Sequence, residues 1–93
     1  MIKNTELTIL KVSAQTSMSA LITSVTERLR SENIVIMDSI GEKASYVALK
    51  AAIAAKRYLP ENQRVAIHPG YVLIDTPEGD RMAIRWTLEL QQV

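Results

Sequence analysis

The chain has 93 residues, of which 47% are hydrophobic, and its formal net charge is +1. A near-neutral charge argues against a strongly basic protein that coats DNA, and the lack of cysteine excludes disulfides, thiolate zinc sites and a thiol nucleophile. No segment resembles a signal peptide or a membrane span, so we expect a cytoplasmic protein with no membrane partner. A chain this short predicts a single domain, 1–93, that needs a partner copy to bury its apolar surface, hence a homo-oligomer, either a dimer or a tetramer.

The first half of the chain predicts two strands separated by a helix. Residues 7–12 are apolar and β-branched, as in a strand, and Thr16 or Ser17 can cap a helix that continues to about Arg30. Residues 34–37 form a continuous apolar run, which is typical of a central strand covered on both faces. A right-handed crossover through the helix makes the two strands parallel.

The second half predicts a helix and a hairpin. Residues 43–59 form an alanine-rich helix that Pro60 ends, and it is apolar around too much of its circumference to face water alone. We expect it to pack on the sheet and on either the first helix or a second subunit. Residues 65–75 and 81–90 predict two strands joined by a loop at 76–80. The fold is therefore α/β, in the order βαβαββ, with a mixed four-stranded sheet and two helices.

The last two predicted strands contain the only histidine and the only tryptophan of the sequence. Residues 68–70, His-Pro-Gly, indicate a bulge or an edge, and a lone histidine without further ligands at metal spacing indicates a structural role. Trp86 shares an apolar stripe with Ile84 and Leu88, which favours a core or dimer contact over base stacking. No nucleophile, base and oxyanion set can be assembled, and no glycine-rich nucleotide motif is present. We expect no enzyme, no metal and no cofactor.

Two strand-to-helix turns, at residues 10–17 and 38–45, predict an anion-binding surface. Free backbone N–H groups gather at helix starts, and the ends of parallel strands meet at one edge of a sheet, so both turns define one face. The candidate nucleic-acid-binding residues are the cations and neutral donors of these turns and of the helix that follows, namely Lys11, Ser13, Gln15, Thr16, Ser17, Lys43, Ser45 and Lys50.

Residues 9–14 (ILKVSA) and 39–41 (SIG), with the alanine-rich helix behind them, resemble the stage V sporulation protein S family. Residues 72–75 (VLID) and 81–85 (RMAIR) resemble its final hairpin. That family resembles the Alba chromatin proteins in fold, so the resemblance implies an Alba-like two-layer sandwich. It also implies a small bacterial homodimer, non-enzymatic and regulatory, that binds RNA or DNA.

The sequence departs from these relatives at the first turn, where Gln15 stands in place of a lysine. Glutamine can donate a hydrogen bond but releases no counterion, which weakens the electrostatic part of phosphate binding. Glu42 weakens the second turn, and the acidic hairpin loop makes a poor DNA arm. Two hypotheses stay open: a module that binds nucleic acid through backbone contacts, or a protein-interaction or scaffold module of the same fold with no nucleic-acid role.

Overall fold

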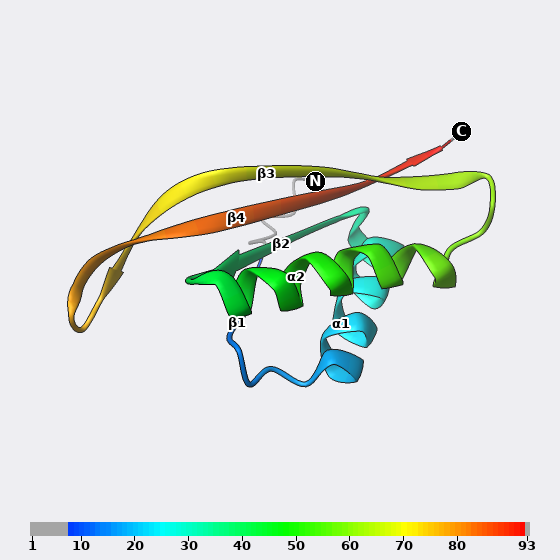
Figure 1. Cartoon of the computed structure of the whole chain (residues 1–93). Coiled ribbons are helices and arrows are strands. Elements are labelled where there is room, and N and C mark those ends of the chain that lie inside the picture. Colours follow the sequence, from blue (N-terminus) through cyan, green and yellow to red (C-terminus); the bar gives the residue numbers. More distant parts are fainter. Residues whose placement is uncertain (1–7, 93) are drawn as a thin grey trace.

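One mixed sheet and two helices form two layers in the computed structural model, which describes residues 8–92 (Figure 1). Four strands lie in the order β1-β2-β4-β3, with β1 and β2 parallel and the other pairs antiparallel. Both helices lie on the same side of this sheet. The predicted fold class and the βαβαββ order are confirmed. The elements are β1 (Ile9–Val12), α1 (Met18–Glu32), β2 (Ile34–Ser39), α2 (Glu42–Ala55), the 3₁₀ turn η1 (Lys56–Tyr58), β3 (Gln63–Thr76) and β4 (Gly79–Gln92).

Helix α1 begins and ends at polar residues that satisfy its backbone. Ser17 is the N-cap, and its Oγ accepts a hydrogen bond from the Ala20 N–H at 3.3 Å. Asn33 ends the helix with φ 66°, a left-handed conformation that asparagine tolerates better than most residues. The Asn33 carbonyl also accepts the Leu90 N–H at 2.8 Å, which ties the helix end to β4. The helix runs two residues beyond the predicted end at Arg30.

Strand β2 is central, as predicted, but it is not covered on both faces. Val35, Met37 and Ser39 are buried on the helix side, whereas Ile34 and Ile36 on the other side are only half-buried. Because both helices lie on one face, the prediction of a doubly covered strand is wrong. Its apolar run reflects one buried face and one partly exposed face.

Helix α2 packs closely because its inner side is made of alanine. Ala48, Ala51, Ala52 and Ala55 are fully buried, and Gly41 precedes the helix with φ 90°, a conformation that favours glycine. The α-helix ends at Ala55 and tightens into η1, so it stops four residues before the predicted end. Because alanine side chains are small, the inner side of α2 packs closely against α1 and the sheet.

The β3–β4 hairpin is longer than predicted and extends beyond β2. Its register runs unbroken from Gln63↔Gln92 to Thr76↔Gly79, while β2 pairs only with residues 84–89 of β4. Residues 68–70 therefore mark an edge strand and not a bulge, since β3 is outermost in the sheet. Met82 is 57% exposed because it lies on this extension, beyond the part of β4 that pairs with β2.

Candidate nucleic-acid interface

The two strand-to-helix turns border one open groove of about 560 Å³. Lys11 and Ser13 line it from the end of β1, and Lys43 lines it from the start of α2. The hairpin closes the groove with Asp75 and Thr76. The predicted convergence of the two turns on one face is therefore present, since parallel β1 and β2 end at the same edge.

The first turn is held by its own side chains. Thr16 Oγ1 accepts the Ser13 N–H at 2.8 Å, and Ser13 Oγ accepts the Gln15 N–H at 3.2 Å. The Thr16 N–H donates to the Ser13 carbonyl at 3.2 Å, and Ser17 caps α1. Several of the N–H groups that could bind a phosphate therefore donate to hydrogen bonds within the turn. The turn is preformed, and all of its residues are exposed except Thr16, which is half-buried.

The second turn contributes fewer of the predicted donors. Ser45 turns inward, with its Oγ 2.9 Å from Ser39 Oγ, and Ser39 Oγ accepts the Trp86 Nε1–H at 2.9 Å. Trp86 is 8% exposed, which confirms its core role. Lys50 lies further along α2, where its Nζ sits 5.1 Å from the centre of the Tyr46 ring. Among these residues only Lys43 reaches the groove.

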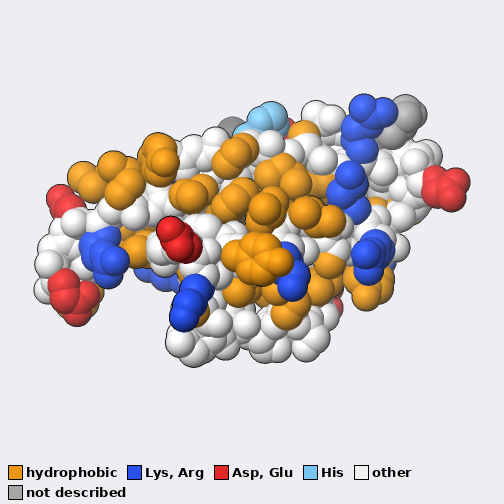
Figure 2. Space-filling view, viewed as in Figure 1, with side chains coloured by type: hydrophobic (Ala, Val, Ile, Leu, Met, Phe, Trp, Pro, Cys, Tyr) orange, Lys and Arg blue, Asp and Glu red, His pale blue; other side chains and the backbone are white. Residues whose placement is uncertain are grey.

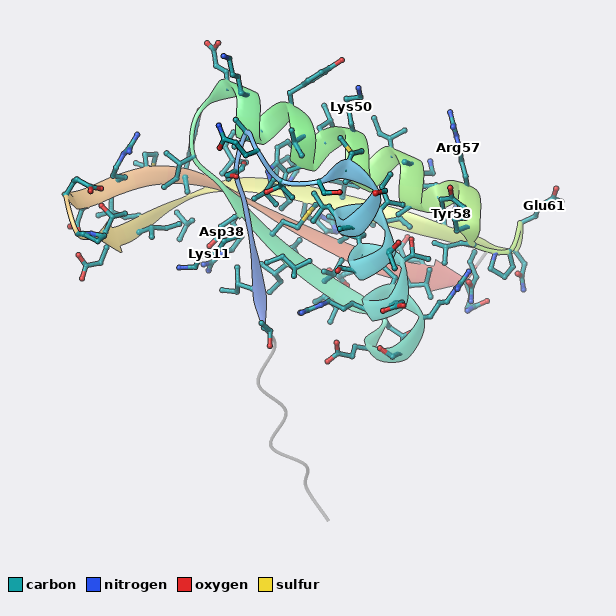
Figure 3. All side chains as sticks on the ribbon, turned by 90° about the horizontal axis from the view of Figure 1, so that it is seen from below. Lys11, Asp38, Lys50, Arg57, Tyr58 and Glu61 are labelled. Carbon is teal, nitrogen blue, oxygen red and sulfur yellow. The ribbon has the colours of Figure 1, made fainter. Side chains whose placement is uncertain are left out.

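An acidic residue that sequence reasoning missed lies in the groove wall. Asp38, at the end of β2, lies next to Lys11 in Figure 3 and is its register partner. Its carboxylate is buried and accepts two hydrogen bonds from Arg85, Nε to Oδ1 at 2.8 Å and Nη2 to Oδ2 at 2.9 Å. The hydrogen bond to Asp38 holds the pKa of Arg85 above its ordinary value, against the opposing effect of burial. Arg85 therefore neutralises the charge of Asp38, so the positive charge of Lys11 remains available to an anion in the groove.

The groove is electrostatically mixed even so. Glu42 and Asp75 line it together with Lys11 and Lys43. Within residues 8–92 neither Glu42 nor Asp75 forms a salt bridge, so a phosphate entering the groove meets two cations and two carboxylates. The groove can hold a phosphate only where the lysines reach outward past the acidic side chains, which predicts weak binding.

A second set of cations lies in the C-terminal half of α2 and in η1. Lys50 and Arg57 project from the outer side of this helix and of η1 (Figure 3), and Lys56 is exposed beside them. Lys56 and Arg57 follow the last turn of α2, where cations interact favourably with the helix dipole. Arg57 is seven residues after Lys50, about two helical turns, and this spacing could have shown that the two lie on one side.

The comparisons with known proteins identify the family. The family model of stage V sporulation protein S (SpoVS) matches residues 8–91 of the chain. The chain belongs to the SpoVS family. This confirms the resemblance seen in the sequence, although among curated proteins none matches the chain.

The SpoVS chain has the Alba fold. Alba from Thermoplasma volcanium superposes with a TM-score of 0.59 over 91% of this chain and 100% of that chain, at 14% sequence identity. Identity this low shows the fold alone. The predicted Alba-like sandwich is confirmed.

Other kinds of site find little support in this SpoVS chain. His68 is exposed, with its Nε2 3.7 Å from Glu89 Oε1. Within residues 8–92 no three or more His, Cys, Asp or Glu residues are grouped to hold a metal ion. Over the same span, neither helix has the length and apolar character needed to cross a membrane.

Proposed function

We propose that this SpoVS chain is a non-enzymatic regulatory protein of the bacterial cytoplasm that binds RNA or DNA through backbone contacts, as an oligomer of single-domain subunits. The observation that carries this proposal is the groove where Lys11 and Lys43 converge beside the exposed first turn. Lysines and helix-start donors contact phosphates without reading bases. The implied function of the Alba-like relatives supports the same reading.

The two lysines of the groove suggest how strongly nucleic acid should bind. Lys50 lies away from the groove, so each subunit offers about two lysine contacts, and log affinity against log salt should have a slope of about −2 on duplex DNA. Glu42 and Asp75 reduce the affinity further. The binding should be weak, salt-sensitive and indifferent to sequence.

The test is a titration of the protein with mixed cellular RNA and with duplex DNA at two salt concentrations. Lys43→Glu should weaken binding to every sequence alike, because phosphates carry no base information. Arg64→Glu is the matched control: it makes the same charge change at an exposed position on β3, away from the groove. Equal losses in the two variants would mean that only overall charge matters, and the groove would not be the interface.

The second candidate function is a protein-interaction or scaffold module. A specific observation favours it: large apolar side chains of α2 and of the hairpin are exposed together, which is unusual on a monomer surface. This hypothesis predicts a folded, oligomeric protein that gives a flat nucleic-acid titration. Such a result would replace the nucleic-acid proposal with the scaffold one.

A further inference from the structure

A second hollow of the protein, which we call the α1 cleft, lies between the outer side of α1 and Tyr58 of η1. Its volume is about 340 Å³, within the range of sites that hold small molecules. Figure 2 shows apolar side chains over α2 and the hairpin, whereas the lower part of the molecule, where Figure 1 places α1, is mostly neither apolar nor charged. The α1 cleft shares no lining residue with the groove beside Lys11 and Lys43, so it is a separate site.

The floor of the α1 cleft is formed by Thr26, the most buried of its lining residues at 6% exposure. The Thr26 hydroxyl is buried and finds no hydrogen-bond partner within residues 8–92. Threonine in a helix adopts either of two χ1 rotamers, so this hydroxyl can turn toward the cleft. A ligand with a polar atom at the floor would provide the hydrogen bond that the free protein lacks. The cleft therefore suits a ligand that carries polar atoms.

The rim of the α1 cleft carries one acidic and one basic side chain that do not pair with each other. Glu27 and Arg30 both line the cleft and are three residues apart, so they are neighbours on the helix surface. In the part of the chain that the structure describes, no salt bridge includes either side chain. The Arg30 Nη2 donates to the Tyr58 carbonyl at 2.6 Å, which holds the guanidinium at the cleft and leaves its other N–H groups available. A hydrogen-bond acceptor and a hydrogen-bond donor, both charged, thus line the same space.

Tyr58 adds an aromatic surface to the α1 cleft. Its side chain is 57% exposed, and Figure 3 shows it next to Arg57 where α2 passes into η1. An exposed tyrosine ring can stack on the face of a planar ligand, and nucleobases stack on such rings irrespective of sequence. Because Arg30 binds the backbone of Tyr58, the chain that carries the ring is fixed relative to the guanidinium. The ligand should therefore be planar, with donors and acceptors along its edge.

We propose that the α1 cleft binds the guanine base of a nucleotide, with Glu27 accepting from N1–H and N2–H, Arg30 donating to O6 and N7, and Tyr58 stacking on the ring. Among the bases of RNA, guanine alone presents two adjacent N–H donor groups beside two adjacent acceptors. A carboxylate has two oxygens that can accept from the donor pair, and a guanidinium has N–H groups in the geometry that the acceptor pair needs. The missing salt bridge between Glu27 and Arg30 leaves both side chains free to flank one base. This inference does not rest on the phosphate contacts of the proposed function.

The experiment is a titration of the full chain with guanosine 5′-monophosphate, followed through the backbone amide signals in NMR spectra. The signals of residues 19–30 and of Tyr58 should shift with a Kd on the order of 1 mM, since the cleft is open and its contacts are few. Inosine 5′-monophosphate lacks the 2-amino group and should bind about tenfold more weakly, and adenosine 5′-monophosphate should bind more weakly still. Ribose 5-phosphate should leave these signals unchanged.

Variants of the α1 cleft separate the contacts with the base. Glu27→Gln should weaken the binding of guanosine monophosphate about tenfold and abolish the preference over inosine monophosphate, because an amide presents one acceptor oxygen and an opposing NH₂ donor. Glu32→Gln makes the same change at an exposed position of α1 outside the cleft and should bind like the parent. Tyr58→Leu should weaken binding, whereas Tyr58→Phe keeps the ring and should retain it. Far-UV circular dichroism confirms that each variant is folded.

Four outcomes would overturn the proposal. They are unshifted α1 signals at about 10 mM guanosine monophosphate, roughly ten times the expected Kd; equal affinities for the guanosine and adenosine monophosphates; a Glu27→Gln variant that keeps the preference for guanosine monophosphate over inosine monophosphate; and binding that Lys43→Glu abolishes, which would place the phosphate in the groove.

The source of the guanine base is settled by two short single-stranded RNAs, one of adenosines only and one with a single central guanosine. Tighter binding of the second RNA, lost in Glu27→Gln, would show that the α1 cleft takes a guanosine of RNA. Equal binding of the two RNAs, with guanosine monophosphate still selected, would show that its ligand is the free nucleotide. A chain that binds guanosine monophosphate and neither RNA would refute the proposed function while leaving this inference standing.

Discussion

Arg85 of β4 and Asp38 of β2 occupy one register position of the sheet and are joined by two parallel hydrogen bonds of 2.8 and 2.9 Å. Lys11 of β1 occupies the next position in the same row, so the buried carboxylate lies between two cations. The row crosses the face of the sheet that the helices leave open. It links the groove wall to the centre of the sheet.

Arg85→Met should destabilise the protein by about 2 kcal/mol, because it removes both hydrogen bonds that Arg85 donates to the buried Asp38 carboxylate. Arg81→Met, an exposed position on the same strand, should cost less than about 0.5 kcal/mol. Urea denaturation measures both. Similar losses in the two variants would show that the ion pair contributes little.

Thr26→Val should raise the melting temperature. Thr26 is 6% exposed, and its Oγ1 is buried with no hydrogen-bond partner among the described residues. An unpaired buried hydroxyl costs about 1–3 kcal/mol, and valine has nearly the same shape without it. Thr23→Val is the control, since the Thr23 hydroxyl donates to the Ser19 carbonyl at 3.0 Å on the exposed side of α1. A lower melting temperature for Thr26→Val would mean that the hydroxyl has a partner in solution.

Ala51→Leu and Ala55→Leu should each destabilise the fold by about 1–3 kcal/mol, because both alanines are fully buried and leave no room for larger side chains. Ala20→Leu, on the exposed side of α1, should be nearly neutral. Thermal unfolding checks all three. Unchanged stability in both buried variants would contradict the close packing of α2.

Gln15→Lys should strengthen nucleic-acid binding and make the salt slope steeper by about 0.9 per subunit, because it adds one phosphate contact. The turn should keep its shape, since Gln15 contributes to it through its backbone N–H and not through its side chain. Gln91→Lys, an exposed position near the end of β4, is the matched control. Identical salt slopes for Gln15→Lys and the parent would show that the first turn is not part of the interface.

The sequence was sufficient to predict the element order, the parallel pairing of the first strands and a helix cap at Thr16 or Ser17, of which the structure has Ser17. Local signals decide these features: apolar periodicity, a hydroxyl before a helix, and a proline after one. The end of α2 was harder, because the tightening into η1 breaks no local rule and Pro60 lies five residues beyond Ala55.

The site was less predictable because it depends on register and on side-chain direction. Asp38 and Arg85 are 47 residues apart in the chain, and only the pairing of β2 with β4 brings them together. Ser45 belongs to a helix-start turn by sequence, yet it turns inward because Ser39 is within reach below it. A helix as apolar as α2 gives no sign of which side faces its own sheet until the alanines are seen to be buried.

The place of Pro69 in β3 has a consequence for aggregation. β3 is a long outer strand of 14 residues, and such edges invite the strands of other molecules to add to them and grow fibrils. The pairing with β4 passes through Pro69↔Trp86 without a break, so the donor that proline lacks is missing from the free edge. A strand that added to this edge would lack one backbone hydrogen bond near the middle of its pairing with β3. The protein can thus display a long hairpin while discouraging edge-to-edge polymerisation.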